Sequence, residues 1–539
     1  MLEKKQKEMT AIAVFILGIL AVAYYILFKE RVEFDSDFTD TVLWAEAMLT
    51  GNGLFDKTMQ YAYTLPFGGS LLMAPFVAMF GLGYKAHLAG FILFLAIFVF
   101  SLFKFLRAMK FSVNETFVAS GVIMLMSLPT KNTRMIMWGH VIHYSLGLLF
   151  VIIAIAIYEK INVDELQFEK IRLGMCENQA ENKDGCNKRN YIWVAVLAIV
   201  IALFCTNGLT TILFFALPFF GAVIAERFFD TEKDLFCKEN INTLGVTLIC
   251  GAAGGIGFLA SKVAQRGVVT VYDDMFKSIP MWQSWIWDIT ERVRCFIVCI
   301  AGGINGEVPM ESFTGIRILF MAFTGFVLIF VPLIASFSYK KFENRFLKIF
   351  FLSYYILLFS TLFIYDFSIA RGTPHRLVGL YMTAVIATVV YMVWLFRNIK
   401  LQRFGFMLAL VLAVASLFST YSVAALRGEN RYDKLSNVLR ENGLTHGYAE
   451  YWSAQVTTIL SENDVVICPI TISDEGEVEK RYYNIRPQQY ENQEGVDRYF
   501  AFLSAWEYET VKDTLGSTAI ETISFDEDGY ILVFDHNFF

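Results

Sequence analysis

The feature that most constrains this chain is a recurring run of about 20 mostly apolar residues, separated by short charged segments. A helix of this length spans the hydrocarbon layer of a membrane. About eleven such runs occur within residues 1–426 of the 539-residue chain. The sequence therefore predicts a mainly helical, polytopic membrane protein. The predicted spans lie near residues 9–28, 86–103, 113–129, 136–157, 191–206, 208–225, 242–260, 317–338, 346–365, 377–396 and 404–424.

Composition supports this class. Hydrophobic residues make up 56% of the chain and charged residues 18%, whereas soluble proteins average about 45–50% and about 25%. These values exclude a soluble enzyme, a disordered chain and a protein that binds nucleic acid through a large basic face.

The pattern changes near residue 426. Residues 427–539 contain no long apolar run, and they carry 21 Asp and Glu against 9 Lys and Arg. Predicted strands near 465–471, 498–504, 518–525 and 530–535 combine with helices near 434–443, 451–463 and 506–515, which is typical of a small α/β domain. We therefore expect a transmembrane domain over 1–426, with interfacial helices in its first outer loop (29–85), followed by an α/β domain over 427–539.

Basic residues indicate the orientation. With the N-terminus in the cytoplasm, the inside segments collect 22 of the 36 Lys and Arg of residues 1–426, as the positive-inside rule requires. Two further apolar stretches, 65–82 and 292–304, are expected to be re-entrant or interfacial. The odd number of spans then places the α/β domain outside the cytoplasmic membrane.

The first outer loop carries the most informative charges. Asp35, Asp37 and Asp40 follow the first span, and an aromatic amphipathic segment, DTVLWAEAMLTG, begins at Asp40. Such a segment lies in the membrane interface. Carboxylates there can accept a proton from a hydroxyl or coordinate a divalent cation. The alternative is that they are solvated, or that they cap a helix starting at Thr41.

Four strings resemble a group of membrane proteins of anaerobic Gram-positive bacteria: DSDFTDTVLWAEAM, LPFGGSLLMAPFVAMFG, WGHVIHYSLG and GLTHGYAEYWSAQVTTILS. The long acidic first loop, the Pro-containing apolar hairpin, the many spans and the C-terminal α/β domain also resemble the C-type (GT-C) glycosyltransferases. The resemblance implies an enzyme of the bacterial cytoplasmic membrane. It would transfer a sugar from a polyprenyl-phosphate donor to a glycan, lipid or protein acceptor, in contact with membrane lipid and without nucleic acid.

In that family an Asp of the first outer loop is the proposed general base. By position the resemblance implies Asp37, with Asp35 as its partner and Asp40 as a capping residue. The family's acidic pair is often adjacent, whereas Ser36 separates the two residues here. On an extended segment, residues 35 and 37 would point the same way. Asp273 and Asp274 form a rival acidic pair.

Basic groups are candidates for binding the donor phosphate. Arg371, His375 and Arg376 lie at the predicted outer edge of a span, where the alternative is interfacial snorkelling. His140 and His143 are expected on one helical face shortly after Arg134, where the alternative is packing or interfacial hydrogen bonding. No metal-ligand spacing occurs, and assistance by Mg²⁺ or Mn²⁺ is left open.

Two other functions compete with sugar transfer. A transporter or lipid flippase usually places ionisable groups near the membrane midplane and contains internal repeats, and neither pattern is evident here. A non-catalytic scaffold whose outer domain binds carbohydrate or a partner also fits. The Tyr-, Trp- and Gln-rich strings at 443–455 and 481–490 are typical of a carbohydrate-binding face and equally of a small core.

Overall fold

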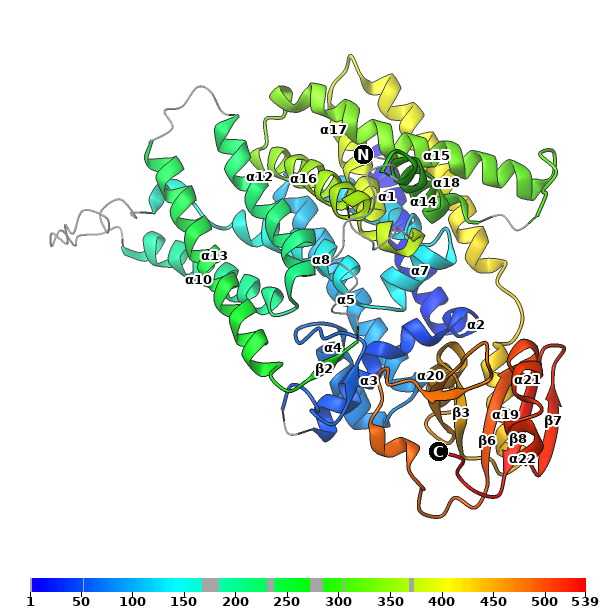
Figure 1. The fold of residues 1–539 in the computed structure, drawn as a ribbon. Coiled ribbons are helices and arrows are strands. Elements are labelled where there is room, and N and C mark those ends of the chain that lie inside the picture. The colour runs from blue at the N-terminus through cyan, green and yellow to red at the C-terminus, as the bar shows by residue number, and fades with distance from the viewer. Residues whose placement is uncertain are drawn as a thin grey trace. The chain divides into compact units, whose positions relative to one another are not determined.

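The computed structural model describes residues 2–51, 53–166, 184–229, 237–271, 285–303, 306–367 and 373–539. Its contacts divide the chain into two compact units (Figure 1). The first unit comprises Met1–Tyr25, Leu95–Val263 and Met275–Ala425, and the second comprises Ile26–Phe94, Ala264–Asp274 and Leu426–Phe539. The predicted boundary between residues 426 and 427 stays a prediction.

The chain is a polytopic helical membrane protein. Within the described ranges, nine helices are long and apolar enough to cross a membrane. They are Lys4–Phe28, Tyr84–Ala108, Lys188–Cys205, Leu209–Phe228, Lys238–Ala264, Phe313–Lys341, Arg345–Ile364, Pro374–Arg397 and Gln402–Ala424. In the element numbering of Figure 1 they belong to α1 (Leu2–Phe28), α5 (Tyr84–Ala108), α10 (Asp184–Cys205), α11 and α12 (Leu209–Thr211 and Leu217–Phe228), α13 (Lys238–Ala264), α15 (Phe313–Ala335), α16 (Arg345–Phe367), α17 (Val378–Arg397) and α18 (Gln402–Ala424).

The other two of the eleven expected spans are shorter than predicted. The run 113–129 forms α6 (Val113–Leu125). The run 136–157 is interrupted at Gly139–Ile142, so that α7 (Lys131–Trp138) ends before α8 (His143–Tyr158) begins. The count of eleven full-length spans is therefore not reproduced, because a continuous apolar run does not reveal a break in its helix.

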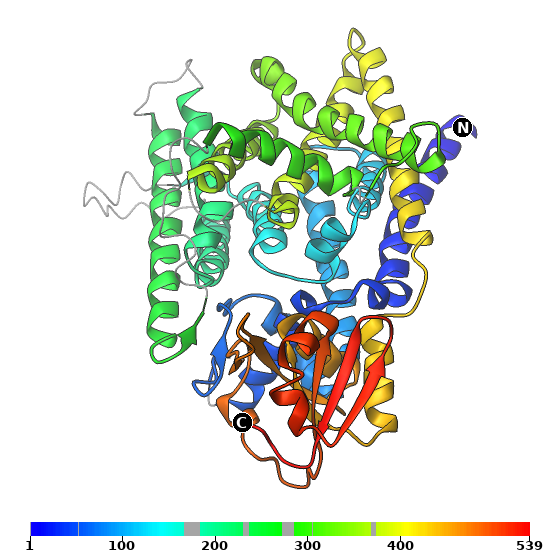
Figure 2. The same ribbon diagram turned by 45° about the vertical axis from the view of Figure 1, so that its right-hand side comes forward.

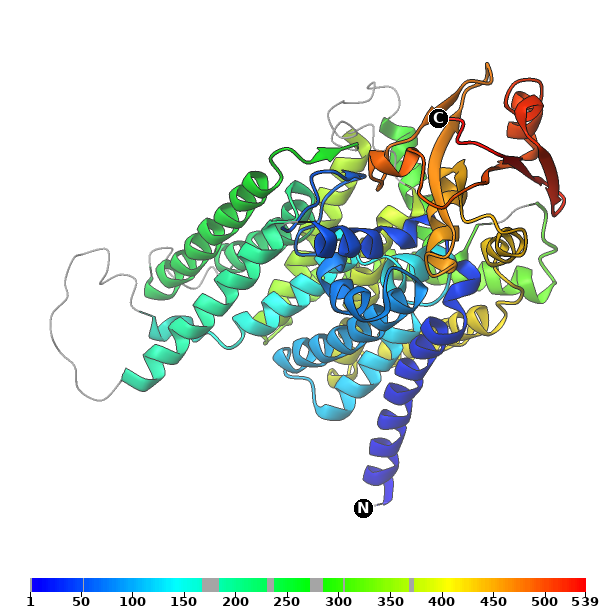
Figure 3. The same cartoon turned by 90° about the horizontal axis from the view of Figure 1, so that it is seen from below.

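Helix α17 forms the centre of the first unit. Its span is 94% buried, against 28–50% for the other spans. It packs against α6, α8, α15, α16 and α18, and α14 (Trp285–Ala301) also contacts it. Away from this centre, α13 lies alongside α10 (Figure 3). A Cβ added at Gly257 would collide with the Ala202 backbone, so this close helix contact requires glycine.

The second unit contains a six-stranded mixed sheet with the order β5-β4-β3-β6-β8-β7 (Figure 2). Strands β3, β4 and β6 are parallel, whereas β5, β7 and β8 join antiparallel. The strands are β3 (His446–Glu450), β4 (Val466–Ile472), β5 (Val478–Lys480), β6 (Tyr499–Ser504), β7 (Glu521–Phe525) and β8 (Gly529–Phe534). The expected C-terminal α/β fold is confirmed, with β3 and β5 as strands that the sequence analysis missed.

Each face of the sheet carries its own apolar core, because side chains alternate along a strand. Ala449, Ile467 and Phe500 pack on one face with Leu435 and Leu439 of α19 (Arg431–Glu441) and Ala454 of α20 (Tyr451–Leu460). Tyr448, Cys468 and Ala501 pack on the other face with Val511 of α21 (Ala505–Val511). Helices α20 and α21 therefore cover opposite faces, and the short α22 (Leu515–Thr518) follows α21.

The loop that follows the first span (residues 29–85) folds together with this domain in the second unit. Its elements are α2 (Glu30–Glu33), α3 (Ser36–Thr50), β1 (Gln60–Tyr61) and α4 (Gly69–Phe80). Helix α3 packs against α4 and α20. Strand β1 pairs in parallel with β2 (Val269–Thr270), and Gln60 exchanges two backbone hydrogen bonds with Ile485.

Arg486 joins the loop to the α/β domain through ion pairs and hydrogen bonds. Its Nε donates to Asp56 Oδ2 at 2.7 Å, and its Nη2 donates to Glu46 Oε2 at 2.9 Å and to Thr50 Oγ1 at 2.6 Å. Burial raises the pKa of Asp56, but hydrogen bonds from Thr58 and Arg486 outweigh burial and hold that pKa below its usual value.

We expect Arg486→Met to reduce the free energy of local unfolding around α3 and β1 by about 2 kcal/mol at pH 7, the scale of a charge-assisted hydrogen bond. Because the folded-state pKa of Asp56 is depressed, its contribution is present above the unfolded pKa of about 4 and is lost as the pH falls through the folded pKa. The difference in the free energy of local unfolding between Arg486→Met and the wild type should therefore become smaller below about pH 4.

Hydrogen exchange of backbone amides in α3 and β1 measures this effect. Arg498→Met is the matched control, because Arg498 pairs with Glu521 on an exposed surface, where such pairs contribute about 0–1 kcal/mol. An equal loss of amide protection in both variants would contradict the role of Arg486 in joining the loop to the α/β domain.

Candidate active site

Asp35 and Asp37 lie at the beginning of α3. The Asp35 backbone is extended, with φ −138° and ψ −176°, and its Oδ1 accepts a hydrogen bond from the Asp37 backbone N–H at 3.2 Å. Asp35 is therefore the N-cap of α3. Both side chains are half-buried.

Two details of the sequence analysis are wrong here. The helix begins at Ser36 rather than Thr41, so Asp40 lies inside it and does not cap it. The pair does not lie on an extended segment either, because Asp37 is already in the first helical turn. The physical reason is that Asp35 satisfies an N–H of the first turn and so allows the helix to start five residues early.

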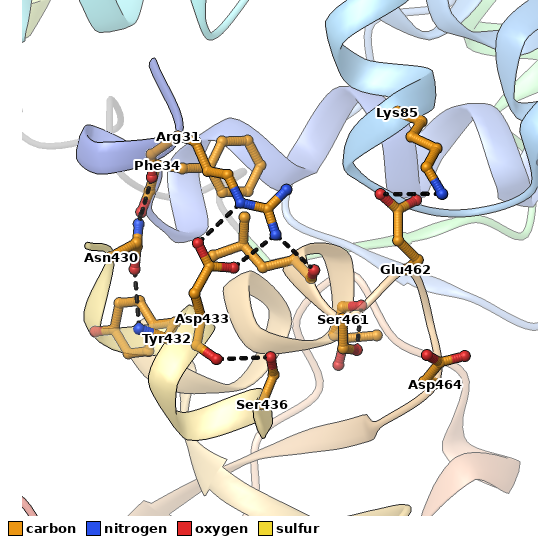
Figure 4. A network of polar contacts seen from close by, with 12 residues as sticks. Arg31, Phe34, Lys85, Asn430, Tyr432, Asp433, Ser436, Ser461, Glu462 and Asp464 are labelled. Atoms are coloured by element: carbon orange, nitrogen blue, oxygen red, sulfur yellow. Dashed lines mark hydrogen bonds and ion pairs between the residues drawn. The ribbon is translucent and has the colours of Figure 1, made fainter. Parts of the chain in front are cut away.

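The C-terminal domain holds the backbone around the two carboxylates. Asn430 donates from Nδ2 to the carbonyl oxygens of Arg31 and Phe34, each at 2.8 Å. The Arg31 guanidinium forms a bidentate pair with Asp433 at 2.8 and 2.7 Å (Figure 4). Between the two carboxylates, the buried Ser36 hydroxyl donates to the carbonyl oxygen of Tyr451 at 2.9 Å.

Asp40 has a structural role. Its side chain is buried, and its Oδ1 accepts a hydrogen bond from Asn484 Nδ2 at 2.6 Å. The Asn484 Oδ1 in turn accepts from Trp44 Nε1 at 2.9 Å and from the Ala62 backbone N–H at 2.8 Å. One amide thus connects α3, the rest of the first loop and the α/β domain.

Two tyrosines of the α/β domain lie near the acidic pair. Burial raises the pKa of Tyr451 well above its usual value, with further contributions from Asp40 and Asp37. Burial also raises the pKa of Tyr432; a hydrogen bond with Ser453 and the charge of Arg431 oppose this effect, and Asp35 adds to it. Both phenols therefore stay protonated at neutral pH.

The sequence analysis did not single out these tyrosines for the site. The aromatic string at 443–455 was a signal for Tyr451 alone, because Tyr432 lies outside it. No local pattern relates Tyr451 to Asp37, more than 400 residues earlier in the chain.

Among the predicted phosphate-binding residues, Arg134 is buried in the first unit. Its Nη1 donates to the Leu128 carbonyl oxygen at 2.6 Å and to Ser422 Oγ at 3.0 Å, and its guanidinium lies 5.6 Å from the Tyr25 ring centre. These contacts stabilise the fold around α7.

His140 and His143 do not share a helical face as expected. His140 lies in the link between α7 and α8, and His143 is the first residue of α8. His140 instead lies close enough to His375 for the two to interact electrostatically. His375 and Arg376 lie in the 3₁₀ turn Pro374–Leu377, where the Thr373 hydroxyl and His375 Nε2 are 3.0 Å apart. Arg371, Asp273 and Asp274 lie outside the described residues.

A metal ion typically requires several converging protein ligands. In the part of the chain covered by the structure, no three His, Cys, Asp or Glu side chains gather to hold one.

The helical body, the acidic first loop and the C-terminal α/β domain together make a GT-C-like fold. The chain is similar in structure to ArnT from Cupriavidus metallidurans, with a TM-score of 0.53, 12% sequence identity and coverage of 97% of both chains. It is also similar to the oligosaccharyltransferase of Archaeoglobus fulgidus in a complex with zinc and sulfate. That match has a TM-score of 0.50 and 10% identity, and covers 93% of this chain and 70% of the other. No protein-family model and no curated protein matches the sequence.

Proposed function

We propose that this protein transfers a sugar from a polyprenyl-phosphate donor to a glycan, lipid or protein acceptor outside the bacterial cytoplasmic membrane. The observation that carries the proposal is the acidic pair at the start of α3, held in place by the α/β domain within a GT-C-like fold. In this reading the N-terminus is cytoplasmic and the α/β domain is extracytoplasmic.

Asp37 acts as the general base. Its carboxylate takes the proton of the acceptor hydroxyl while the acceptor oxygen forms a bond to the anomeric carbon of the donor sugar. The bond between the anomeric carbon and the phosphate oxygen breaks, and the polyprenyl phosphate leaves with the electron pair. Asp35 is the partner: its side chain binds the Asp37 N–H and fixes the first turn of α3.

The leaving phosphate requires positive charge, which guanidinium groups supply with two parallel hydrogen bonds. We assign this role to Arg371 and Arg376, assisted by His375, His140 and His143. A divalent cation, Mg²⁺ or Mn²⁺, would supply the same charge stabilisation when bound.

The test is made in cells that produce the protein or lack it. Loss of the protein should remove one sugar from a cell-surface glycan, lipid or glycoprotein and should cause the matching polyprenyl-phosphate sugar to accumulate. Unchanged surface sugars and an unchanged donor pool would contradict the proposal. Uptake of labelled substrate into proteoliposomes without sugar transfer would instead identify a transporter or flippase.

A further inference from the structure

The α/β domain contains a pocket of about 370 Å³. Ligand pockets span about 300–1,000 Å³, so the space suits a small molecule or a short stretch of a polymer. The polar and aromatic residues that line it include Glu450, Ser453, Thr471, Arg481, Ser504 and Trp506.

The pocket lies where ligands bind in α/β folds. Glu450, Thr471 and Ser504 stand at the carboxyl ends of the parallel strands β3, β4 and β6. Strands β3 and β6 are neighbours, and the helices that follow them, α20 and α21, cover opposite faces of the sheet. Chain connections that diverge in this way leave a crevice at the carboxyl ends of the strands, which is the usual ligand site of open sheets.

The lining has the chemistry of a carbohydrate site. Sugar hydroxyls both donate and accept hydrogen bonds. The pocket offers serine and threonine hydroxyls, the acceptor carboxylate of Glu450 and the donor guanidinium of Arg481. The indole of Trp506 is 56% exposed. An exposed indole at a polar pocket provides an apolar face on which a pyranose ring can stack.

The charged groups that line the pocket disfavour an anionic ligand. The guanidinium of Arg431 already forms a bidentate pair with Asp526 at 2.8 and 3.0 Å. Arg481 lies 3.7 Å from a Glu450 oxygen and over the Tyr451 ring, and Glu507 adds a second carboxylate to the lining. In this fully described domain, β3 and β6 also pass directly into their helices without a glycine-rich phosphate loop.

The pocket is connected to the acidic pair through two tyrosines. Tyr432 interacts with Ser453 of the pocket lining and also with Asp35. Tyr451 carries Arg481 over its ring, 5.2 Å from the ring centre, and also interacts with Asp37. Tyr451 directly follows Glu450 of the pocket lining, and its carbonyl oxygen accepts the hydrogen bond of Ser36 at 2.9 Å. A chain molecule bound in the pocket would therefore lie beside the start of α3.

We infer that this pocket binds a neutral glycan and that, resting on the proposed function, this glycan is the acceptor whose hydroxyl is brought to Asp37.

The experiment uses Trp506→Ala in the full-length protein, purified in nanodiscs. Short neutral hexose and N-acetylhexosamine oligosaccharides, hexuronic acid oligosaccharides and inorganic phosphate are the probes for calorimetric binding. We expect Trp506→Ala to weaken binding of a neutral oligosaccharide about tenfold, the scale of one lost stacking contact. In a transfer assay it should raise the acceptor KM by a similar factor, with kcat retained.

Trp452→Ala is the matched control, because Trp452 is exposed to a similar extent (50%) but does not line the pocket. Equal effects of both variants, binding of phosphate or uronic acid instead, or transfer with an unchanged acceptor KM would overturn the inference. If neutral glycans bind through Trp506 while no transfer occurs, the proposed function fails and the glycan site stands.

Discussion

Replacement of Asp37 by asparagine is expected to lower the rate of sugar transfer by about 10²–10⁴-fold, the contribution of a general base. Asparagine has nearly the shape of aspartate and no proton-accepting carboxylate. It occupies the first turn of α3 without disturbing the Asp35 cap, since that cap binds the backbone of residue 37. The Asp37→Asn protein should therefore fold normally but transfer the sugar much more slowly.

Two companion variants make this result specific. Asp35→Asn should retain most of the activity, because asparagine caps a helix as well as aspartate does, whereas Asp35→Ala should cost about 1 kcal/mol of helix stability. Glu429→Gln removes an exposed carboxylate of the same unit and should leave transfer unchanged. An active Asp37→Asn protein beside an inactive Asp35→Asn protein would reverse the assignment.

The second large effect is expected at Asn484. Replacement by leucine removes a hydrogen bond from the Asp40 carboxylate, from the Trp44 indole N–H and from the Ala62 backbone N–H at once. The loss of three hydrogen bonds of buried groups, each about 1–3 kcal/mol, is expected to cost about 3–5 kcal/mol in total. The free energy of unfolding of the second unit should fall by this amount.

Thermal unfolding and hydrogen exchange of α3 and α20 measure the loss. Asn484 has a φ of +51°, a conformation that leucine disfavours, so the strain must be measured separately. Asn463→Leu is the matched control, because Asn463 has a φ of +67° but is exposed. If the two variants lose equal stability, the buried network contributes nothing.

Apolar periodicity was sufficient to predict the class of fold. Each of the nine long spans corresponds to a run recognised in the sequence, because length and hydropathy act locally. The break at Gly139–Ile142 was not predictable in this way, since its residues do not interrupt the apolar run. Strand β3 was missed for the opposite reason: its residues, HGYAE, lack the Val and Ile that mark a strand.

Gly447 of strand β3 lies in close contact with the neighbouring strand β6. A Cβ there would collide with the Phe500 side chain and backbone of β6. The constraint that selects glycine is thus a tertiary contact, which hydropathy does not express.

In the candidate site, too, local features were predictable from the sequence and long-range contacts were not. Asp35 and Asp37 were singled out from the sequence because the acidic motif and the family resemblance are local. Their surroundings were not, because bonds such as Trp44–Asn484 and Arg31–Asp433 join residues more than 400 positions apart. The cap at Asp35 was missed because Asp40 offers an equally good local start signal for a helix.

The most direct test of the central claim is a reconstituted transfer reaction. Full-length protein in proteoliposomes would be supplied with polyprenyl-phosphate-linked sugars and an acceptor glycan, lipid or peptide, with EDTA or with added Mg²⁺ or Mn²⁺. Mass spectrometry would follow donor and acceptor. We expect that each sugar gained by the acceptor is matched by one released polyprenyl phosphate, and that Asp37→Asn slows both by about 10²–10⁴-fold. Two results would contradict the proposed sugar transfer: donor that stays intact in the presence of correctly folded wild-type protein, or equal turnover by the wild type and Asp37→Asn.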